Sequence, residues 1–207
     1  MKNFFLFLFV CMLSSVLFSQ QTKIGDWGMH LNYTNINTII AENEKIYIGT
    51  DSGLFLYNEE DNSLTSFSKL DGLSSLNITA LDYDNGVLIV GYIDGNIDIL
   101  QNNRVFSIPH IEMANILGSK KINDIFIQNN LAYVSCPFGL VVINISEREI
   151  AETCYLSEDG TKTEVFAAHV FDTTINSDVD YFLANKVFLA TNRGLFYADK
   201  NSNLLDY

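Results

Sequence analysis

Short runs of alternating hydrophobic and polar residues cover most of the chain, and they recur at intervals. Four segments align, each with apolar residues on both sides of a central glycine. They are Ile46 to Asn58 (IYIGTDSGLFLYN), Leu88 to Leu100 (LIVGYIDGNIDIL), Ala132 to Asn144 (AYVSCPFGLVVIN) and Val187 to Asp199 (VFLATNRGLFYAD). Because β-branched and aromatic residues flank a residue that tolerates positive φ, each segment is predicted to form two strands joined by a tight turn.

Two positions of the repeat carry small residues. The central glycines are spaced by 42, 44 and 55 residues, and a further small residue precedes each of them by four positions. A missing side chain in a strand lets a neighbouring sheet approach closely, so each unit is expected to pack against another. The turn glycines are Gly53, Gly95, Gly139 and Gly194, and the small strand residues are Gly49, Gly91, Ser135 and Ala190.

The rest of each period supplies two more strands, one before and one after the aligned segment. Four short antiparallel strands per period of about 40 to 45 residues are typical of a β-propeller blade, so the predicted fold is an all-β propeller. The added strands are Ile36 to Ala41 and Leu64 to Ser68, Ile78 to Tyr83 and Arg104 to Ile108, and Ile122 to Ile127 and Ile150 to Leu156. The predicted blades are about 36–75, 76–120, 121–165 and 166–207.

The fourth unit is longer than the others, and its additional residues lie between Phe166 and Phe182. The stretch His169 to Asp180 (HVFDTTINSDVD) is predicted to be an extended loop between two strands. Loops on one face of a propeller are common places for binding. The sequence favours a solvated loop over a binding loop here.

The number of repeats bears on whether the ring is complete. A propeller closes with roughly four to eight blades, and four units are present before the chain reaches Tyr207. One interpretation is a rare small propeller, and the other is the N-terminal part of a longer protein. A partial ring leaves two apolar end faces uncovered, which a free domain avoids. We therefore expect an incomplete ring from a longer chain.

The N-terminus has the pattern of an export signal. Lys2 is followed by the apolar run Phe4 to Val10 (FFLFLFV), and small polar residues follow toward Ser19 and Gln20. Residues 1–20 are therefore predicted to be a cleaved signal peptide, and residues 21–207 to be the exported propeller part. A membrane anchor is the alternative, but a spanning helix needs about 20 apolar residues and this run contains serines. Lipidation at Cys11 is disfavoured because Phe9 and Val10 precede it.

Composition and charge narrow the classes of partner. Hydrophobic residues make up 48% and aromatic residues 13% of the 207 residues, which excludes a disordered chain. The net charge of −13 argues against nucleic-acid binding, which relies on clustered basic side chains. No second segment is apolar enough to cross a membrane. Cys136 and Cys154 allow a disulfide in an oxidising compartment, but two buried thiols are the favoured interpretation.

The candidate chemistry is sparse, and no catalytic residue, metal site or cofactor is predicted. His30, His110 and His169 have neither metal-site nor triad spacing. The segment Asp94 to Asp98 imitates the start of a calcium loop but lacks the later glycine and acid, so a blade turn is favoured. Trp27 is expected to anchor the N-terminal segment. The aromatic residues Phe55, Tyr57, Phe196 and Tyr197 are expected to form core between blades.

Several segments, in order along the chain, resemble the N-terminal β-propeller of the PorZ family, whose members are components of the type IX secretion system of Bacteroidota. They include WGMHLNY (27–33), SKLDGLSSLNITAL (68–81), INDIFIQNNLAYVSCPFGLVVINI (122–145) and EIAETCYLSEDG (149–160). The resemblance implies a larger exported protein with two propellers and a C-terminal sorting domain. It carries over no ligand-binding residue, so these residues are unknown.

The resemblance also implies a setting and partners, in the periplasm or at the outer-membrane surface. The family works with the sortase of the system and an outer-membrane shuttle protein, in a complex that removes the sorting signal of cargo proteins and links them to anionic lipopolysaccharide. The family member handles lipopolysaccharide and is not the catalyst. The implied function is a non-enzymatic binding or scaffold component.

Two other functions remain open. The stretch GTDSGLFLYN is also similar to the repeats of periplasmic propellers in hybrid two-component regulators, which detect glycans. An enzyme of propeller fold is the third hypothesis, and it requires acids or histidines that converge on the central channel. The innermost predicted strands offer only Asp82 and Asp124 for that purpose.

Overall fold

The computed structural model describes residues 35–156, 162–171 and 185–199, which all belong to one compact unit, Leu31–Tyr207. These residues form an all-β fold of antiparallel sheets, and the sheets are consecutive blades of the β-propeller type. The predicted signal peptide, residues 1–20, lies outside the described residues. So do Trp27, His30 and residues 172–180 of the predicted long loop.

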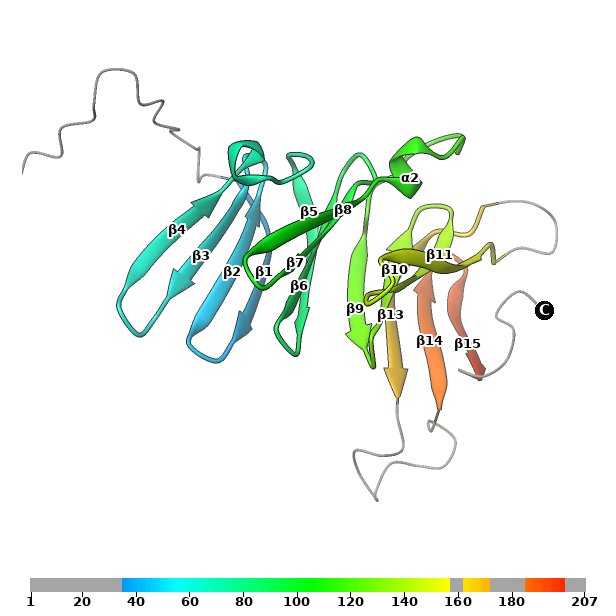
Figure 1. The fold of residues 1–207 in the computed structure, drawn as a ribbon. Coiled ribbons are helices and arrows are strands. Elements are labelled where there is room, and N and C mark those ends of the chain that lie inside the picture. Colours follow the sequence, from blue (N-terminus) through cyan, green and yellow to red (C-terminus); the bar gives the residue numbers. More distant parts are fainter. Residues whose placement is uncertain (1–34, 157–161, 172–184, 200–207) are drawn as a thin grey trace, which may run out of the picture. The chain divides into compact units, whose positions relative to one another are not determined.

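Each blade pairs its strands in the order of the chain (Figure 1). Blade 1 contains β1 (Ile36–Glu42), β2 (Lys45–Thr50), β3 (Leu54–Asn58) and β4 (Ser63–Phe67). Blade 2 contains β5 (Ile78–Asp84), β6 (Val87–Tyr92), β7 (Ile97–Gln101) and β8 (Arg104–Ile108). Blade 3 contains β9 (Asp124–Gln128), β10 (Leu131–Cys136), β11 (Gly139–Asn144) and β12 (Glu149–Cys154). The described part of blade 4 contains β13 (Val165–Phe171), β14 (Lys186–Thr191) and β15 (Gly194–Asp199).

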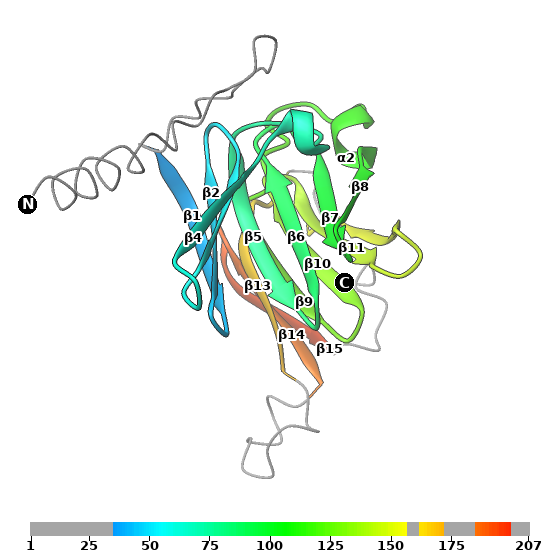
Figure 2. The same ribbon diagram turned by 60° about the vertical axis from the view of Figure 1, so that its left-hand side comes forward.

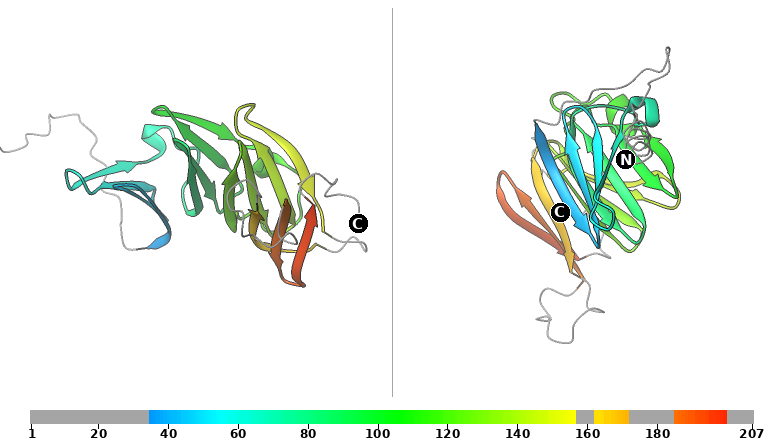
Figure 3. Two further views of the ribbon diagram at one scale, coloured as in Figure 1. Left: turned by 90° about the horizontal axis from the view of Figure 1, so that it is seen from below. Right: turned by 90° about the vertical axis from the view of Figure 1, so that its left-hand side faces the viewer.

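The first strand of each blade contacts the first strand of the next. Strand β1 lies beside β5, β5 beside β9, and β9 beside β13 (Figures 1 and 2). The sheets therefore follow one another in the order of the chain (Figure 3). We call β1, β5, β9 and β13 the inner strands. Consecutive blades thus meet along their inner strands.

The two ends of the blades differ in turn chemistry. At one end, strands are joined by hairpins with asparagine in the left-handed conformation, such as Asn102 (φ 51°) and Asn103 (φ 58°) between β7 and β8. Asparagine tolerates this conformation better than most residues, and two such residues in succession fit a type I′ hairpin. The other end carries the glycine turns and the connections between blades, including the short helices η1 (Lys69–Asp71) and α2 (His110–Met113). We call these the asparagine end and the glycine end.

Three apolar clusters fill the interfaces between blades. Each combines residues of two consecutive blades, for example Leu54 with Ile78 and Leu81 between blades 1 and 2. Strands β6 and β11 of the two middle blades are buried along nearly their whole length, whereas β1 of blade 1 and β15 of blade 4 are mainly exposed. The core therefore lies between blades and thins toward the first and the last.

Two features differ from the sequence-based expectations. His169 to Phe171 belong to β13 and not to a loop, because they pair with residues of β14. Strand β9 begins at Asp124, two residues later than predicted, since Asn123 lies in an irregular step before the regular ladder. The connection after blade 1, for which no structure was predicted, includes the helix η1, where Ser68 and Asp71 make a capping box.

Candidate functional site

The small residue in the second strand of a blade accommodates the inner strand of the next blade. A Cβ atom added to Gly49 would lie 2.5 Å from Cγ2 of Ile78, and one added to Gly91 would lie 2.6 Å from Cγ2 of Ile122. Such distances are too short for non-bonded carbon atoms. Ser135 is fully buried at the same position of blade 3. Ala190, at this position of blade 4, is exposed.

The central glycines lie at the glycine end, between the second and third strands of their blades. Gly95 has φ 93° and Gly139 has φ 142°, conformations that strain other residues. A Cβ on Gly139 would also lie 2.1 Å from the carbonyl oxygen of Cys154. Gly53 and Gly194 occupy the same turns in blades 1 and 4.

In blades 1 to 3, a polar side chain near the start of the inner strand forms a hydrogen bond to the next blade. This residue directly follows Ile36, Ile78 or Ile122 in the sequence. Asn37 Nδ2 donates to the carbonyl oxygen of Ile78 (3.1 Å), and Thr79 Oγ1 donates to that of Ile122 (2.6 Å). Asn123 Nδ2 donates to that of Val165 (2.8 Å). This set was not predicted from the sequence, although a polar residue directly follows Ile36, Ile78 and Ile122 in the repeat. The same position of blade 4 holds Phe166, which has no donor.

The two inner-strand acids also bond to the next blade. Asp82 Oδ2 accepts a hydrogen bond of 2.5 Å from the backbone N–H of Ile127, and Asp124 accepts one from the backbone N–H of Ala168. Burial raises the pKa of the Asp82 carboxyl to about 6, with smaller contributions from the charges of Asp124 and Asp84, although N–H groups favour its charged form. Burial raises the pKa of Asp124 as well. Both acids thus serve the packing of blades.

The raised pKa of Asp82 gives an expected pH dependence of stability. The folded state binds this proton more tightly than the unfolded state, so the contribution is fully present below about pH 4 and is lost as the pH rises through about 6. Asp82→Asn is expected to flatten that decline and to raise the free energy of unfolding at pH 7 by about 1 kcal/mol, a value reduced for solvent screening. Urea unfolding at several pH values measures it. The exposed-turn variant Glu60→Gln is the control, and an unchanged slope in the Asp82 variant would contradict the assignment.

One carboxylate of blade 2 is fully buried. Asp98 Oδ2 accepts hydrogen bonds from the Tyr92 hydroxyl (2.7 Å) and the backbone N–H of Ser74 (2.8 Å). Asp98 Oδ1 and Ser74 Oγ are buried and have no hydrogen-bond partner among the described residues. The residues at the same ladder position of blades 1 and 3 are Phe55 and Val141, so the acid replaces an apolar residue. Asp94, its companion in the calcium-like segment, accepts instead from Asn96 N–H and the Ser75 hydroxyl at the turn.

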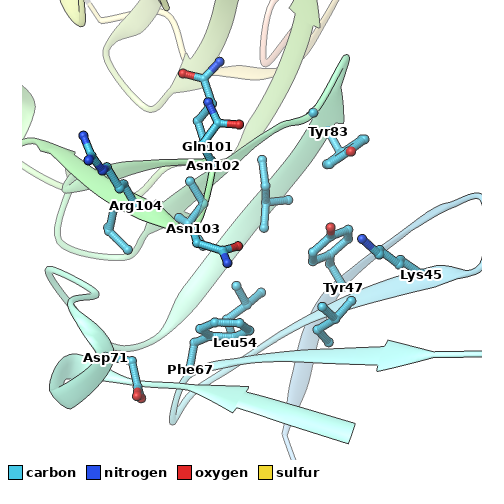
Figure 4. A pocket seen from close by; sticks show the side chains of 15 residues that line it. Lys45, Tyr47, Leu54, Phe67, Asp71, Tyr83, Gln101, Asn102, Asn103 and Arg104 are labelled. Atoms are coloured by element: carbon cyan, nitrogen blue, oxygen red, sulfur yellow. The ribbon is translucent and has the colours of Figure 1, made fainter. Parts of the chain in front are cut away.

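A groove of about 470 Å³ opens between blades 1 and 2 (Figure 4), and we call it the blade 1–2 groove. The rings of Tyr47 and Tyr83 stack inside it, with centroids 5.5 Å apart and planes at 21°. Burial raises the pKa of Tyr47, as do the nearby Tyr83 and Glu42. The remaining lining combines apolar, amide and charged side chains, namely Lys45, Leu54, Leu56, Phe67, Asp71, Leu88, Leu100, Gln101, Asn102, Asn103, Arg104 and Val105, with Gly86.

A smaller pocket of about 280 Å³ adjoins the groove, and we call it the arginine pocket. Gln101, Asn102 and Arg104 line both, while Phe106 and Arg148 complete the smaller one. The Arg148 guanidinium lies 3.4 Å from the centre of the Phe106 ring, a cation–π contact. Two of the three arginines of an acidic chain thus line one pocket. In the described part of the chain, neither forms an ion pair.

The backbone of Arg148 is unusual. Ten described residues other than glycine have positive φ, and all except Arg148 (φ 60°) are asparagine. A bulky residue in this conformation stores strain, and such strain is found most often at functional positions. The turn between β11 and β12 therefore holds the Arg148 guanidinium over the Phe106 ring, and the strained backbone of Arg148 lowers the stability of the folded state.

The side chains that line the groove and the pocket have the chemistry of a binding surface for a polar ligand. Stacked tyrosines with amide neighbours suit the face and hydroxyl groups of a sugar, and guanidinium groups suit carboxylate or phosphate. Among the described residues, no group of histidine, cysteine and acidic side chains is arranged to hold a metal ion. His169 packs between the rings of Phe126 and Phe171, and His110 is exposed on α2.

The cysteines and aromatic residues occupy mixed positions. Cys136 and Cys154 are free and buried, in agreement with the favoured interpretation, and burial raises the pKa of both thiols. Phe55 is buried. Tyr197 was expected in the core, yet its side chain is exposed because nothing described covers that face of blade 4.

In the described part of the chain, no helix reaches the length and apolar character of a membrane span.

The fold defines a β-propeller module whose described residues form repeated blades. A family model described as the N-terminal β-propeller domain of PorZ, of the type IX secretion system (TSS9), matches residues 46–207. The chain therefore belongs to the family of PorZ N-terminal β-propeller domains. A sequence comparison with curated proteins gives no match.

Solved structures agree with the fold. PorZ of Porphyromonas gingivalis, described as an essential bacterial surface component of the type IX secretion system, superposes with a TM-score of 0.72 and 24% identity, over 88% of this chain and 23% of that chain. The extracellular domain of a protein assigned as a hybrid two component system of B. thetaiotaomicron gives 0.57 and 16%, over 79% and 20%. The computationally designed protein Ika4 gives 0.58 and 16%, over 84% and 99%. This chain thus spans less than a quarter of the PorZ structure.

Proposed function

We propose that the chain is a non-enzymatic binding module of the type IX secretion system, exported to the periplasm or the outer-membrane surface. In this role it supports the sortase-dependent attachment of cargo proteins to anionic lipopolysaccharide, in contact with the sortase and the outer-membrane shuttle protein. The observation that carries the proposal is the family match over residues 46–207. The likeness to PorZ of P. gingivalis supports the same assignment.

The chemistry of the blade 1–2 groove supports a glycolipid ligand. Tyr47 and Tyr83 offer aromatic faces, and the β7–β8 hairpin offers amide groups beside them. Arg104 and Arg148 supply positive charge in a chain with a net charge of −13. An anionic saccharide needs aromatic stacking, amide hydrogen bonds and guanidinium contacts together. The groove and the arginine pocket present all three around one hairpin.

Deletion of the gene tests the role in secretion. Cargo proteins in the deletion strain are expected to keep their sorting signal and to be lost from the cell surface. The sorting signal is followed by mass spectrometry of secreted cargo, and reintroduction of the intact gene should restore its removal. Normal processing of cargo in the deletion strain would refute the secretion role.

Substitutions in the arginine pocket test the ligand. Arg104→Gln is expected to weaken binding of purified anionic lipopolysaccharide by about tenfold, since a hydrogen bond to a charged group contributes roughly 1.5–3 kcal/mol. Titration calorimetry at two salt concentrations measures the affinity and its electrostatic part. The matched control is Arg193→Gln, the third arginine, on blade 4. Equal affinities of the wild-type chain and both variants would exclude this pocket as the lipopolysaccharide site. The secretion role would not be affected, because the gene deletion tests it separately.

A second candidate function is a glycan-sensing propeller of a hybrid two-component regulator. The likeness to the extracellular domain of the B. thetaiotaomicron protein favours it. The coding sequence that follows the codon of Tyr207 separates the two functions. A second propeller followed by a β-sandwich supports the secretion role, and a membrane-spanning helix followed by a histidine kinase supports the sensor.

A further inference from the structure

Large apolar side chains are exposed at the glycine end of the blades. Leu117 is 83%, Leu70 76% and Met113 75% exposed, more than any other large apolar side chain of the described residues. All three lie in connections between blades. The other exposed apolar side chains of this end, with smaller exposed fractions, are Leu76, Ile93 and Tyr155. The glycine end therefore carries apolar surface that is separate from the strands of blades 1 and 4.

This surface lies at an end of the blades and not between them. The connections that contain η1 and α2 lie at the same end of the blades (Figures 1 and 2). Propeller blades stand side by side around a ring, so a further blade packs against the face of its neighbour. Further blades would extend the ring sideways and leave the glycine end of blades 2 and 3 as it is. The exposure of Met113 and Leu117 is therefore independent of the number of blades.

The connection between blades 2 and 3, residues 109–121, has an apolar inner side and an apolar outer side. On the inner side, Ile111 is buried and Ile116 packs against the apolar cluster between the two blades. On the outer side, Met113 and Leu117 have no cover in the described part of the chain. Burial of the inner residues holds the connection against the blades, so the outer side chains project from a fixed support.

Lysines bond to the backbone of the same connection. Lys120 Nζ donates a hydrogen bond to the carbonyl oxygen of Glu112. Lys162 Nζ, from the connection between blades 3 and 4, donates one to the carbonyl oxygen of Leu117. These bonds order the connection before any partner arrives, which lowers the entropic cost of binding. They also place positive charge directly beside a projecting apolar side chain.

The two ends of the blades differ in exposed charge. Among the described residues, the exposed basic residues of the glycine end outnumber its exposed acids, and the reverse holds at the asparagine end. The glycine end has Lys69, Lys121, Lys162 and Arg193 against Asp71 and Glu112, and the asparagine end has Lys45, Arg104 and Arg148 against Glu42, Glu44, Glu59, Glu60, Asp61, Glu147, Glu149 and Asp199. A negatively charged surface therefore attracts the glycine end and repels the asparagine end.

We propose that the glycine end binds the surface of a membrane that contains anionic phospholipids. Met113 and Leu117 enter the boundary between headgroups and acyl chains, and Lys121 and Lys162 contact the phosphates. Projecting apolar side chains with lysines beside them suit a fluid lipid layer, because binding there depends on buried apolar area and charge and not on a matched surface. The proposal goes beyond the secretion role and does not rest on it.

Co-sedimentation with lipid vesicles tests the proposal. The purified chain is expected to bind vesicles of phosphatidylcholine and phosphatidylglycerol, and to bind vesicles of phosphatidylcholine alone much more weakly. Leu117→Ser is expected to weaken binding by about tenfold, because it removes most of one buried apolar side chain. Lys121→Gln is expected to weaken it by about fivefold, and added salt should weaken it further.

Matched substitutions at the asparagine end serve as controls. Leu64→Ser and Lys186→Gln change an exposed leucine and a lysine that lie away from the glycine end, and both variants are expected to bind vesicles like the wild-type chain. Circular dichroism checks that each variant is folded. Met113→Ser replaces Leu117→Ser if the latter does not fold.

Tryptophan emission reports whether the apolar side chains enter the lipid. Leu117→Trp is expected to shift its added emission to shorter wavelength on anionic vesicles, whereas Leu64→Trp is not. The wild-type chain has a single tryptophan, Trp27, so its emission with vesicles is the baseline for both variants.

Several outcomes would overturn the proposal. A wild-type chain that binds neither kind of vesicle would show that another partner, such as a protein or a further part of the chain, covers the glycine end. Equal binding to both kinds of vesicle would exclude the role of the lysines. A loss of binding in Lys121→Gln but not in Leu117→Ser or Met113→Ser would indicate attraction by charge without insertion.

Discussion

Gly91→Ala is expected to destabilise the protein by about 2–3 kcal/mol, because the added methyl group has no space between blades 2 and 3. Its Cβ would lie 2.6 Å from Cγ2 and 2.9 Å from Cβ of Ile122. Both atoms belong to a fully buried side chain whose backbone is tied to Thr79, so the neighbour has little freedom to move. Urea unfolding, followed by circular dichroism, measures the loss.

The same position in blade 3 supplies a matched control. Ser135→Ala leaves a Cβ where one already exists and removes a buried hydroxyl without a hydrogen-bond partner, so it is expected to be neutral or slightly stabilising. Ile122→Ala combined with Gly91→Ala should cost less than the two single changes added together, because the two side chains compete for one space. Strictly additive losses would mean that Gly91 acts through backbone conformation and not through the contact.

Tyr92→Phe is expected to cost about 1–3 kcal/mol, since it takes one of two hydrogen-bond donors from the buried carboxylate of Asp98. Asp98→Leu, which introduces an apolar side chain where blades 1 and 3 also have one, is expected to cost about 3 kcal/mol because it leaves the Tyr92 hydroxyl and the Ser74 N–H buried without an acceptor. Chemical denaturation at neutral pH gives both values.

The double variant Tyr92→Phe with Asp98→Leu separates a polar network from simple packing. It removes the hydroxyl and the carboxylate together, so its loss is expected to be clearly smaller than the sum of the single losses. A matched apolar change, Val141→Leu at the same ladder position of blade 3, controls for the size of the new side chain. Additivity of the two single losses would show that Tyr92 and Asp98 contribute independently.

The hairpins were predictable because their signals are local. Alternation on both sides of Gly53 or Gly139 places two strands and a turn within about a dozen residues, and the observed strands follow it closely. Strand β13 was cut short in the prediction because His169 and the polar residues after it suggest a loop. In the structure its ladder with β14 continues to Phe171, and His169 is accommodated between aromatic rings.

The binding surfaces were not predictable from local patterns. Tyr47 and Tyr83 lie in different blades, so their stacking depends on how the two sheets pack. Arg104 and Arg148 meet only because the β7–β8 and β11–β12 hairpins lie at the same end of adjacent blades. The sequence predicted that Asp98 belongs to a turn, whereas in the structure it lies in β7 and its carboxylate is buried beside the Tyr92 hydroxyl. The hydrogen bonds of Asn37 and Thr79 to the next blade could have been predicted, because polar residues recur at this position with the blade period.

The position of the core determines which strands unfold locally most easily. Blades 2 and 3 have a neighbour on both faces, whereas β1 and β15 at the two extremes are largely exposed. In a linear series of this kind, each unit is held only by the units beside it. Among the described strands, the backbone amides of β6 and β11 are therefore expected to stay protected from solvent exchange longer than those of β1 and β15.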